Sequence, residues 1–493
     1  MATFTIGGRA SLLRYAGKSG LILLAAGILL FLVIRAALTF DPSWDAIAYH
    51  YPFAARLAGI CGHDCLQMTP GLEQDYVAFP VVIEFIQGWL WRLTGVPEAT
   101  NFVSVAALFV FVAYLAVHWR VLWYWAVIGL TAIPVVQVYS TSSYTDLATN
   151  VAAAIGLLTV AELLFRPDRV RVGVQTLFAL SMILLGNSKT QMMPVAAAIT
   201  MAFIVLMTYT SADRPDRAFD LRRPVAGAAF STVLLLLVNA TALRNLVEFG
   251  NPYYPVQISI LGHQFLPGYL PPLAGNSAPE YLRGAPSPLR WLLSVFEFSA
   301  FDLRVMPYSV GQGDVPQSAP SFRMGGYFAT YILTAVGFLM IALTRLGKTG
   351  LLLGGYFLAL TVATALMPAS HELRYYMFWA LSLIALLLII YASPSFGAEL
   401  SAELSLAWRW IMLSCFVAVT MLTGGHFFRP GLYFNVADFI AKNGFEATVK
   451  KLKDGQTVCV ADERFAILYS RAYHPHRAYK VIQGDDPTCD TRI

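Results

Sequence analysis

Long apolar runs constrain the fold of this chain more than any other feature. Most of them are long enough, or nearly so, for a helix to cross a bilayer. The runs are Leu21–Phe40, Val103–Val117, Val121–Val138, Leu147–Phe165, Val174–Leu185, Met192–Met207, Ala226–Ala242, Tyr327–Leu343, Leu351–Leu366, Met377–Tyr391 and Trp408–Leu422. Lipid offers the backbone no hydrogen-bond partner, so such runs form membrane helices. We therefore expect an all-α polytopic membrane protein with about eleven transmembrane helices, two of them, Val174–Leu185 and Met192–Met207, short enough to be re-entrant.

The composition agrees with a membrane location. Of the 493 residues, 57% are hydrophobic and 13% are charged, whereas a soluble domain carries about a quarter charged residues. The net charge of +5 lies in short loops, so we expect it to set the orientation and to contact membrane lipids. No motif typical of nucleic-acid binding is present, and no nucleic-acid partner is expected.

Basic residues predict the orientation of the helices. Arg9, Arg14 and Lys18 precede the first run, which places the N-terminus in the cytoplasm. Loops on the same side then hold Arg120, Arg166, Arg169, Arg171, Arg214, Arg217, Arg222, Arg223, Arg345 and Lys348. An odd number of spans places the C-terminus outside, in the periplasm if the membrane is a bacterial inner membrane. The first run is too long for a signal-peptide core, so we expect it to remain as a helix.

Three polar stretches fall on the outer side, at residues 41–101, 244–326 and 428–493. In the first, Trp44–Gly59 and Pro80–Thr94 are amphipathic and aromatic, which is typical of helices that lie in the membrane interface. The second stretch is rich in Pro and Gly and is expected to be an ordered loop. We therefore divide the chain into a transmembrane domain, 1–427, and a small periplasmic domain, 428–493.

The C-terminal stretch has an α/β pattern. We expect a helix from Asn435 to Leu452, a strand over Thr457–Val460, a short helix from Glu463 and a strand over Ala478–Ile482. No glycine-rich phosphate loop is present, so this appendage is expected to be a lid or docking surface rather than a nucleotide site.

Four of the five cysteines lie in the outer stretches. An oxidising compartment would allow two local disulfides, Cys61 with Cys65 and Cys459 with Cys489. The alternative is a zinc site at the first pair and His63, which lacks a fourth ligand and a usual zinc spacing.

Two carboxylates stand at the outer end of the first apolar run. On a helix, Asp41, Asp45 and Tyr49 would share one face. Asp41 precedes a proline, a pair common where a new helix begins, so it suits a capping role. Asp45 would lie one turn further in, and an ionisable group beside lipid is costly unless it faces a cavity. We predict that Asp45 is functional, with a buried hydrogen-bonding role as the alternative.

Asp45 and Tyr49 resemble the Asp-Glu-x-x-Tyr motif in the first external loop of GT-C glycosyltransferases, which use polyprenyl-phosphate sugars. Aminoarabinose transferases and protein O-mannosyltransferases are examples of this family. The resemblance implies that Asp45 lies by the reacting sugar, as a base or as a ligand of a divalent cation such as Mg or Mn. Ala46 replaces the motif's second acid, so Asp45 lacks the neighbouring carboxylate of a two-carboxylate metal site.

Further segments resemble motifs of the same family, in the family's order. They are Phe79–Phe85, Tyr144–Asp146, Gly186–Lys189 followed by Pro194, Arg244–Asn245 with Gly250–Pro255, and Arg374–Tyr375. All of them lie on one predicted side of the membrane. Together they imply a GT-C-like fold and an inverting glycosyltransferase.

The chemistry of glycosyl transfer needs cations beside the departing phosphate and a carboxylate near the acceptor hydroxyl. The basic candidates at the outer interface are Lys189, Arg244, His371 and Arg374. Basic residues at membrane ends also snorkel to lipid head groups without binding a substrate. We favour phosphate binding for Lys189, which sits in a very short outer turn against the basic-residue bias, and for Arg374.

We therefore expect the chain to move a sugar from a polyprenyl-phosphate donor to a hydroxyl of a lipid, glycan or protein acceptor. Asp45 would be the base, with Asp41 or a divalent cation beside it. Other substrate contacts would come from Tyr49, His50, Glu84 and Asp146, although the last two also suit helix caps. Two other functions stay open: a transporter or flippase of lipid-linked sugar, and a glycan polymerase or ligase with a polyprenyl-diphosphate donor.

Overall fold

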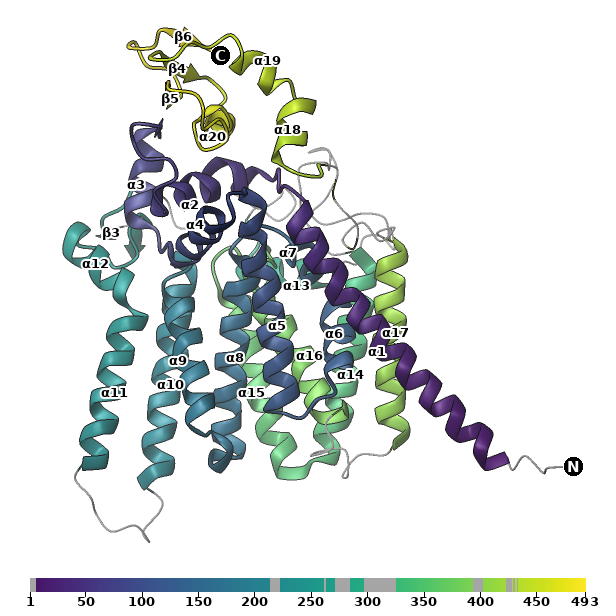
Figure 1. Cartoon of the computed structure of the whole chain (residues 1–493). Helices are drawn as coiled ribbons and strands as arrows, with labels where there is room; N and C mark the ends of the chain where they lie inside the picture. Colours follow the sequence, from purple (N-terminus) through teal and green to yellow (C-terminus); the bar gives the residue numbers. More distant parts are fainter. Residues whose placement is uncertain are drawn as a thin grey trace, which may run out of the picture.

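A bundle of long helices forms the body of the protein (Figure 1). The computed structural model describes residues 6–212, 222–260, 263–270, 284–296, 325–392, 402–422, 428, 431 and 433–493. The bundle contains α1 (Ile6–Leu38), α5 (Phe102–Val117), α6 (Trp123–Thr131), α8 (Asp146–Phe165), α9 (Val172–Gly186), α10 (Met193–Ala212), α11 (Arg222–Val238), α14 (Gly325–Arg345), α15 (Gly347–Leu366), α16 (Met377–Ala392) and α17 (Ala402–Leu422). The predicted apolar runs fall on these helices and on two short ones, α7 (Pro134–Tyr139) and α12 (Ala240–Phe249).

The number of membrane-crossing helices differs from the expected number. Within the described ranges, six helices are long and apolar enough to cross a membrane, or seven if the bent pair α11 and α12 is one span. Three further apolar helices are shorter: Val172–Gly186, Ala329–Arg345 and Met377–Ala392. Run Val121–Val138 is divided between α6 and α7, where Pro134 begins the second helix. The helices mark a membrane-embedded protein, but the prediction of about eleven spans is not confirmed.

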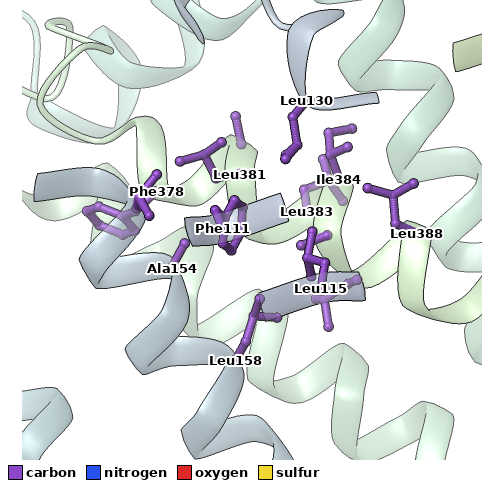
Figure 2. Packing of buried hydrophobic residues seen from close by; sticks show 14 of the residues in the cluster. Phe111, Leu115, Leu130, Ala154, Leu158, Phe378, Leu381, Leu383, Ile384 and Leu388 are labelled. Carbon is purple, nitrogen blue, oxygen red and sulfur yellow. The ribbon is translucent and has the colours of Figure 1, made fainter. Parts of the chain in front are cut away.

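The centre of the bundle is the contact between α5, α8 and α16. Figure 2 shows Phe111 and Leu115 of α5 among Leu158 of α8 and Leu381 and Ile384 of α16. Every residue of α16 is buried, as expected for a helix that is apolar on all sides. The loop that precedes α16 is therefore held over the middle of the bundle end.

The bend between α11 and α12 fixes a second loop at this end. The two helices meet at 60°, and Asn187 accepts hydrogen bonds from the backbone nitrogen (3.0 Å) and the hydroxyl (2.7 Å) of Thr241. A Cβ atom on Gly186 would lie 2.1 Å from the carbonyl oxygen of Val238, so only glycine permits this approach. Together these contacts hold the loop that carries Lys189 against the bend.

Short helices cover the same end of the bundle, as the sequence predicts for the first outer stretch. They are the π-helical turn η1 (Ala46–His50), α2 (Tyr51–Leu57), α3 (Pro70–Ala78) and α4 (Val82–Thr94). Helix α4 buries Glu84 and Trp91 and exposes Phe85, Trp89 and Leu93. This amphipathic division suits a helix in the membrane interface.

The C-terminal segment packs on this cover (Figure 1). Its parallel sheet has the order β1 (Leu66–Gln67), β5 (Lys480–Gln483), β4 (Thr457–Val460) and β6 (Thr491–Arg492). The predicted strand Thr457–Val460 is confirmed. The predicted helix from Asn435 to Leu452 is instead two helices, α18 (Val436–Lys442) and α19 (Phe445–Val449), because Gly444 adopts a φ of 75° between them. A short helix, α20 (Ala466–Tyr469), completes this part. Strand β1 comes from the first outer stretch, so the C-terminal segment shares its sheet with residues 41–101.

Both predicted disulfides form, Cys61 with Cys65 and Cys459 with Cys489. The first pair therefore cannot ligate zinc as thiolates, and the alternative zinc site is wrong. In the middle outer stretch, β2 (Ile258–Ile260) and β3 (His263–Leu266) form an antiparallel hairpin, and α13 (Ser287–Val295) follows. Residues 271–283 and 297–324 of that stretch, and Arg214 and Arg217, lie outside the described residues.

Candidate functional site

An ion pair between Asp45 and Arg374 lies at the covered end of the bundle. Asp45 is the residue before η1, and Arg374 lies in the loop between α15 and α16. Nη1 of Arg374 is 2.9 Å from Oδ2 of Asp45, and each side chain is 16% exposed. Nε of the same guanidinium lies 3.5 Å from Oε2 of Glu372. Arg374 thus faces two carboxylates in a largely buried position that remains partly open.

A second ion pair joins α8 to the loop before α10. Nζ of Lys189 donates to Oδ1 of Asp146 at 2.6 Å, and Asp146 is fully buried. The ring of Tyr375 brings the two pairs together, because Lys189 Nζ is 4.5 Å and Arg374 Cζ is 4.9 Å from its centroid. Cations within about 6 Å of an aromatic face are attracted by it. Two cations from distant parts of the chain therefore share one aromatic ring.

Asn150 of α8 fixes the backbone that carries Arg374. Its amide nitrogen donates to the carbonyl of Arg374 at 2.9 Å and to that of Asp146 at 2.7 Å. Its amide oxygen accepts from the backbone nitrogen of Phe378 at 2.8 Å. The amide thus links the start of α16 to the start of α8. This link fixes the positions of the two ion pairs relative to each other.

Asp41 has a different role from Asp45. Its Oδ1 accepts from the backbone nitrogen of Ser43 at 3.0 Å. Its Oδ2 accepts from the backbone nitrogen and the hydroxyl of Ser143, at 2.9 and 3.1 Å. Asp41 therefore binds the loop before α8, a long-range role rather than the local helix cap that its sequence predicts.

Burial and charge act in opposite directions on the carboxylates of the site. Burial raises the pKa of Asp45, but nearby positive charge, that of Arg374 above all, outweighs burial and leaves the pKa below its ordinary value. Burial also raises the pKa of Glu372, and here Arg374 offsets it only in part. Of the two carboxylates beside Arg374, Asp45 is therefore the one whose ionised form the surroundings favour.

The other predicted site residues are distributed around this cluster. Tyr49 and His50 follow on η1, with ring centroids 4.3 Å apart. His50 contacts Glu84, with Nδ1 and Oε1 2.9 Å apart. His371 is fully buried, and its Nε2 lies 3.9 Å from Glu372.

Arg244, which the sequence predicts as a phosphate-binding candidate, makes its contacts with other residues than those of the Asp45–Arg374 and Lys189–Asp146 pairs. Its guanidinium donates to the carbonyl of Ala78 at 3.1 Å and to the side chain of Asn245 at 3.0 Å. Asn245 in turn donates to the carbonyls of Ala78 and Tyr254. The pair therefore joins α12 to the end of α3 and to the following loop.

Three members of the site were not predicted from the sequence: Glu372, Tyr375 as a shared ring, and Asn150. Glu372 stands two residues before Arg374, and an acid so close to a predicted phosphate ligand was a usable signal. Asn150 lies one helical turn after Asp146, but a lone polar residue in an apolar helix does not indicate its partners. Its role depends on a contact across 224 residues.

The donor set around Asp45 suits a divalent cation poorly. One carboxylate oxygen of Asp45 faces Arg374, and both oxygens of Asp41 accept hydrogen bonds from the backbone and a hydroxyl. Ala46 stands where a second acid would be needed. A cation bound there would also lie close to Arg374, a fixed positive charge.

The arrangement can receive an anion next to a base. A lysine ammonium has three N–H donors and a guanidinium has five, so Lys189 and Arg374 retain donors beyond those used for their carboxylates. No protein-family model matches the chain, and no curated protein matches it significantly.

Proposed function

We propose that the chain is a GT-C-type inverting glycosyltransferase that moves a sugar from a polyprenyl-phosphate donor to a hydroxyl of a lipid, glycan or protein acceptor. The proposal places the reaction on the periplasmic side of a bacterial inner membrane. One observation carries it: the ionised Asp45 lies beside Arg374, and Arg374 shares the ring of Tyr375 with Lys189. Base and cations are the groups that this transfer needs in one place.

The donor phosphate would bind to Lys189 and Arg374. The departing oxygen gains negative charge as the sugar leaves, so donors that are already in place lower the barrier without reorganising. Both cations are held by carboxylates and by Tyr375, and the backbone of Arg374 is held by Asn150. Their positions are therefore set before the donor arrives.

Asp45 would take the proton from the acceptor hydroxyl. Its pKa lies below the ordinary value, so it is deprotonated at neutral pH, as a base must be. Inversion follows from the resemblance to GT-C enzymes, in which the acceptor attacks from the side opposite to the phosphate. We assign no step to a divalent cation, because the donors around Asp45 suit one poorly.

The proposal is tested by incubating the purified protein with a panel of radiolabelled polyprenyl-phosphate monosaccharides and membrane lipid extract. Transfer of label from at least one donor to a new product supports the glycosyltransferase. Transfer only from polyprenyl-diphosphate donors would favour the polymerase or ligase. Movement of intact donor across a vesicle bilayer without a new product would favour the transporter.

A further inference from the structure

A buried histidine and glutamate lie beside Asp45 and have no part in the reaction proposed above. Nδ1 of His50 is 2.9 Å from Oε1 of Glu84, and the two residues are 2% and 4% exposed. His50 ends the π-helical turn η1, which Asp45 precedes, and Glu84 lies on the buried face of α4. Because a π-helix pairs residues five apart, Asp45 and His50 lie one turn apart on one face. The ring centroid of His50 lies 5.7 Å from that of Tyr144, and Arg374 Cζ lies 5.5 Å from the same Tyr144 ring, so His50 lies beside the Asp45–Arg374 pair.

The contact with Glu84 determines which nitrogen of His50 carries the proton. A carboxylate oxygen accepts, so the tautomer that satisfies this contact is the one in which Nδ1 donates to Glu84. Among the described residues Nε2 has no hydrogen-bond partner, although it is buried. A buried N–H without an acceptor is rarer in proteins than an unsatisfied acceptor. The arrangement therefore favours the tautomer with its hydrogen on Nδ1 and a lone pair on Nε2.

We propose that His50 is a second proton acceptor in the transfer and that Glu84 is its positioning residue, an inference that rests on the proposed function. The acceptor oxygen forms its bond to the anomeric carbon, and the bond from that carbon to the phosphate oxygen breaks with its electron pair on phosphate. Asp45 takes the hydroxyl proton and passes it through a bridging water to Nε2 of His50, which makes no direct hydrogen bond to Asp45. The proton then leaves His50 for the departing phosphate or for water.

The ion pair at Asp45 gives the physical reason for this second step. A protonated Asp45 would leave Arg374 with only the more distant carboxylate of Glu372, 3.5 Å from its Nε, in a largely buried position, which is costly. Passing the proton to His50 restores the Asp45–Arg374 pair. Glu84 then balances the imidazolium charge at Nδ1, as a carboxylate does when it orients a catalytic histidine.

Two substitutions at one position separate this role from a structural one. The amide nitrogen of an asparagine occupies roughly the place of Nδ1, so His50→Asn keeps the hydrogen bond to Glu84 and removes the acceptor at Nε2. We expect kcat to fall about a hundredfold, with donor Kd unchanged. Glu84→Gln should lower kcat less, because the amide oxygen still accepts from Nδ1 but carries no charge.

The matched control is His118→Gln, because His118 contacts Glu162 through Nε2 and the amide nitrogen of a glutamine occupies roughly the place of Nε2. His118 also contacts a buried glutamate, Glu162, but it follows α5 and lies against the end of α8 away from Asp146. We expect kcat of this variant to equal that of the wild type. If His50 serves only to hydrogen-bond Glu84, the variant His50→Asn should also keep the wild-type kcat. That result would overturn the proposal.

A second measurement does not depend on activity. In the ¹⁵N spectrum of histidine-labelled protein, the signal lost in His50→Asn identifies His50 among the eight histidines. We expect its Nε2 to be unprotonated at neutral pH; a proton on Nε2 would overturn the proposal. A wild-type protein that transfers no sugar would overturn the proposed function and the relay together, whereas full activity of His50→Asn would overturn the relay alone.

Discussion

The guanidinium of Arg374 lies 2.9 Å from the carboxylate of Asp45, although 329 residues separate them in the chain. Asp45 follows the first membrane helix, and Arg374 precedes a helix whose every residue is buried. The pair therefore joins the edge of the bundle to its centre, at the end covered by α2 and α4.

Asp45→Asn should abolish the proposed transfer, since the amide keeps the size of the side chain but removes the basic oxygen. We expect turnover to fall by about a hundredfold or more, with donor binding preserved and some loss of stability, because Arg374 then keeps only Glu372 as a counter-charge. The measurement is single-turnover transfer by the purified variant, with donor binding assayed separately. If the variant turns over at nearly the wild-type rate, Asp45 is not the catalytic base.

Asp41→Asn should instead act on stability. Both oxygens of Asp41 accept hydrogen bonds, and an amide can replace only one of them, so a donor of Ser43 or Ser143 loses its acceptor. Leaving a buried donor unsatisfied costs about 1–3 kcal/mol, more than the few tenths expected of a simple helix cap. Thermal unfolding measures this change, and turnover of the folded fraction should be near that of the wild type. An inactive but fully stable variant would reverse the roles of Asp41 and Asp45.

Lys189→Ala and Arg374→Ala should weaken use of the donor. Loss of one charge-assisted phosphate contact costs about 1.5–3 kcal/mol, so the apparent donor constant should rise by one to two orders of magnitude. Lys442→Ala is the control, because Lys442 pairs with Asp438 on the exposed C-terminal helix α18. If both variants keep the wild-type donor constant, these cations do not bind phosphate.

The Asp45–Arg374 pair should give the protein an acid-sensitive component of stability. A carboxyl whose pKa is lowered on folding stabilises the folded state above its unfolded pKa, and this stabilisation is lost as the pH falls through the lowered value. Glu372, whose pKa is raised by burial, acts with the opposite sign, since ionisation costs stability as the pH rises. Below about pH 4, the unfolding temperature of the wild type should therefore fall more steeply than that of Asp45→Asn. Parallel curves would contradict this assignment.

The C-terminus and Asp45 should face the same compartment, outside the cytoplasm. The C-terminal sheet includes β1 from the stretch that follows Asp45, so the two cannot lie on opposite sides. We expect an alkaline-phosphatase fusion at Ile493 to be active and a fusion before Arg9 to be inactive. An inactive fusion at Ile493 would place the site in the cytoplasm and would contradict the proposed periplasmic reaction.

Local patterns in the sequence determined most of the secondary structure and the cysteine pairing of this protein. Apolar runs such as Leu147–Phe165 became helices, and Thr457–Val460 became a strand, because each depends on the period and polarity of neighbouring residues. The cysteine pairs were predictable because each is close in sequence or shares one small segment. The candidate residues Asp45, Lys189 and Arg374 were found from their type and their place at helix ends. The number of spans was not determined, since it depends on where a helix stops and whether it bends.

Only the tertiary structure decided which charges meet. The pairing of Asp45 with Arg374, and of Lys189 with Asp146, follows from the packing of α8 and α16 and from the hydrogen bonds of Asn150. The same packing places the carboxylate of Asp41 against Ser143 in the loop before α8, so Asp41 does not cap a helix of its own. A buried charged side chain needs a partner, and the residues next to it in the sequence can indicate that it is buried. They do not indicate which partner it contacts, because that depends on the packing of helices that lie far apart in the chain.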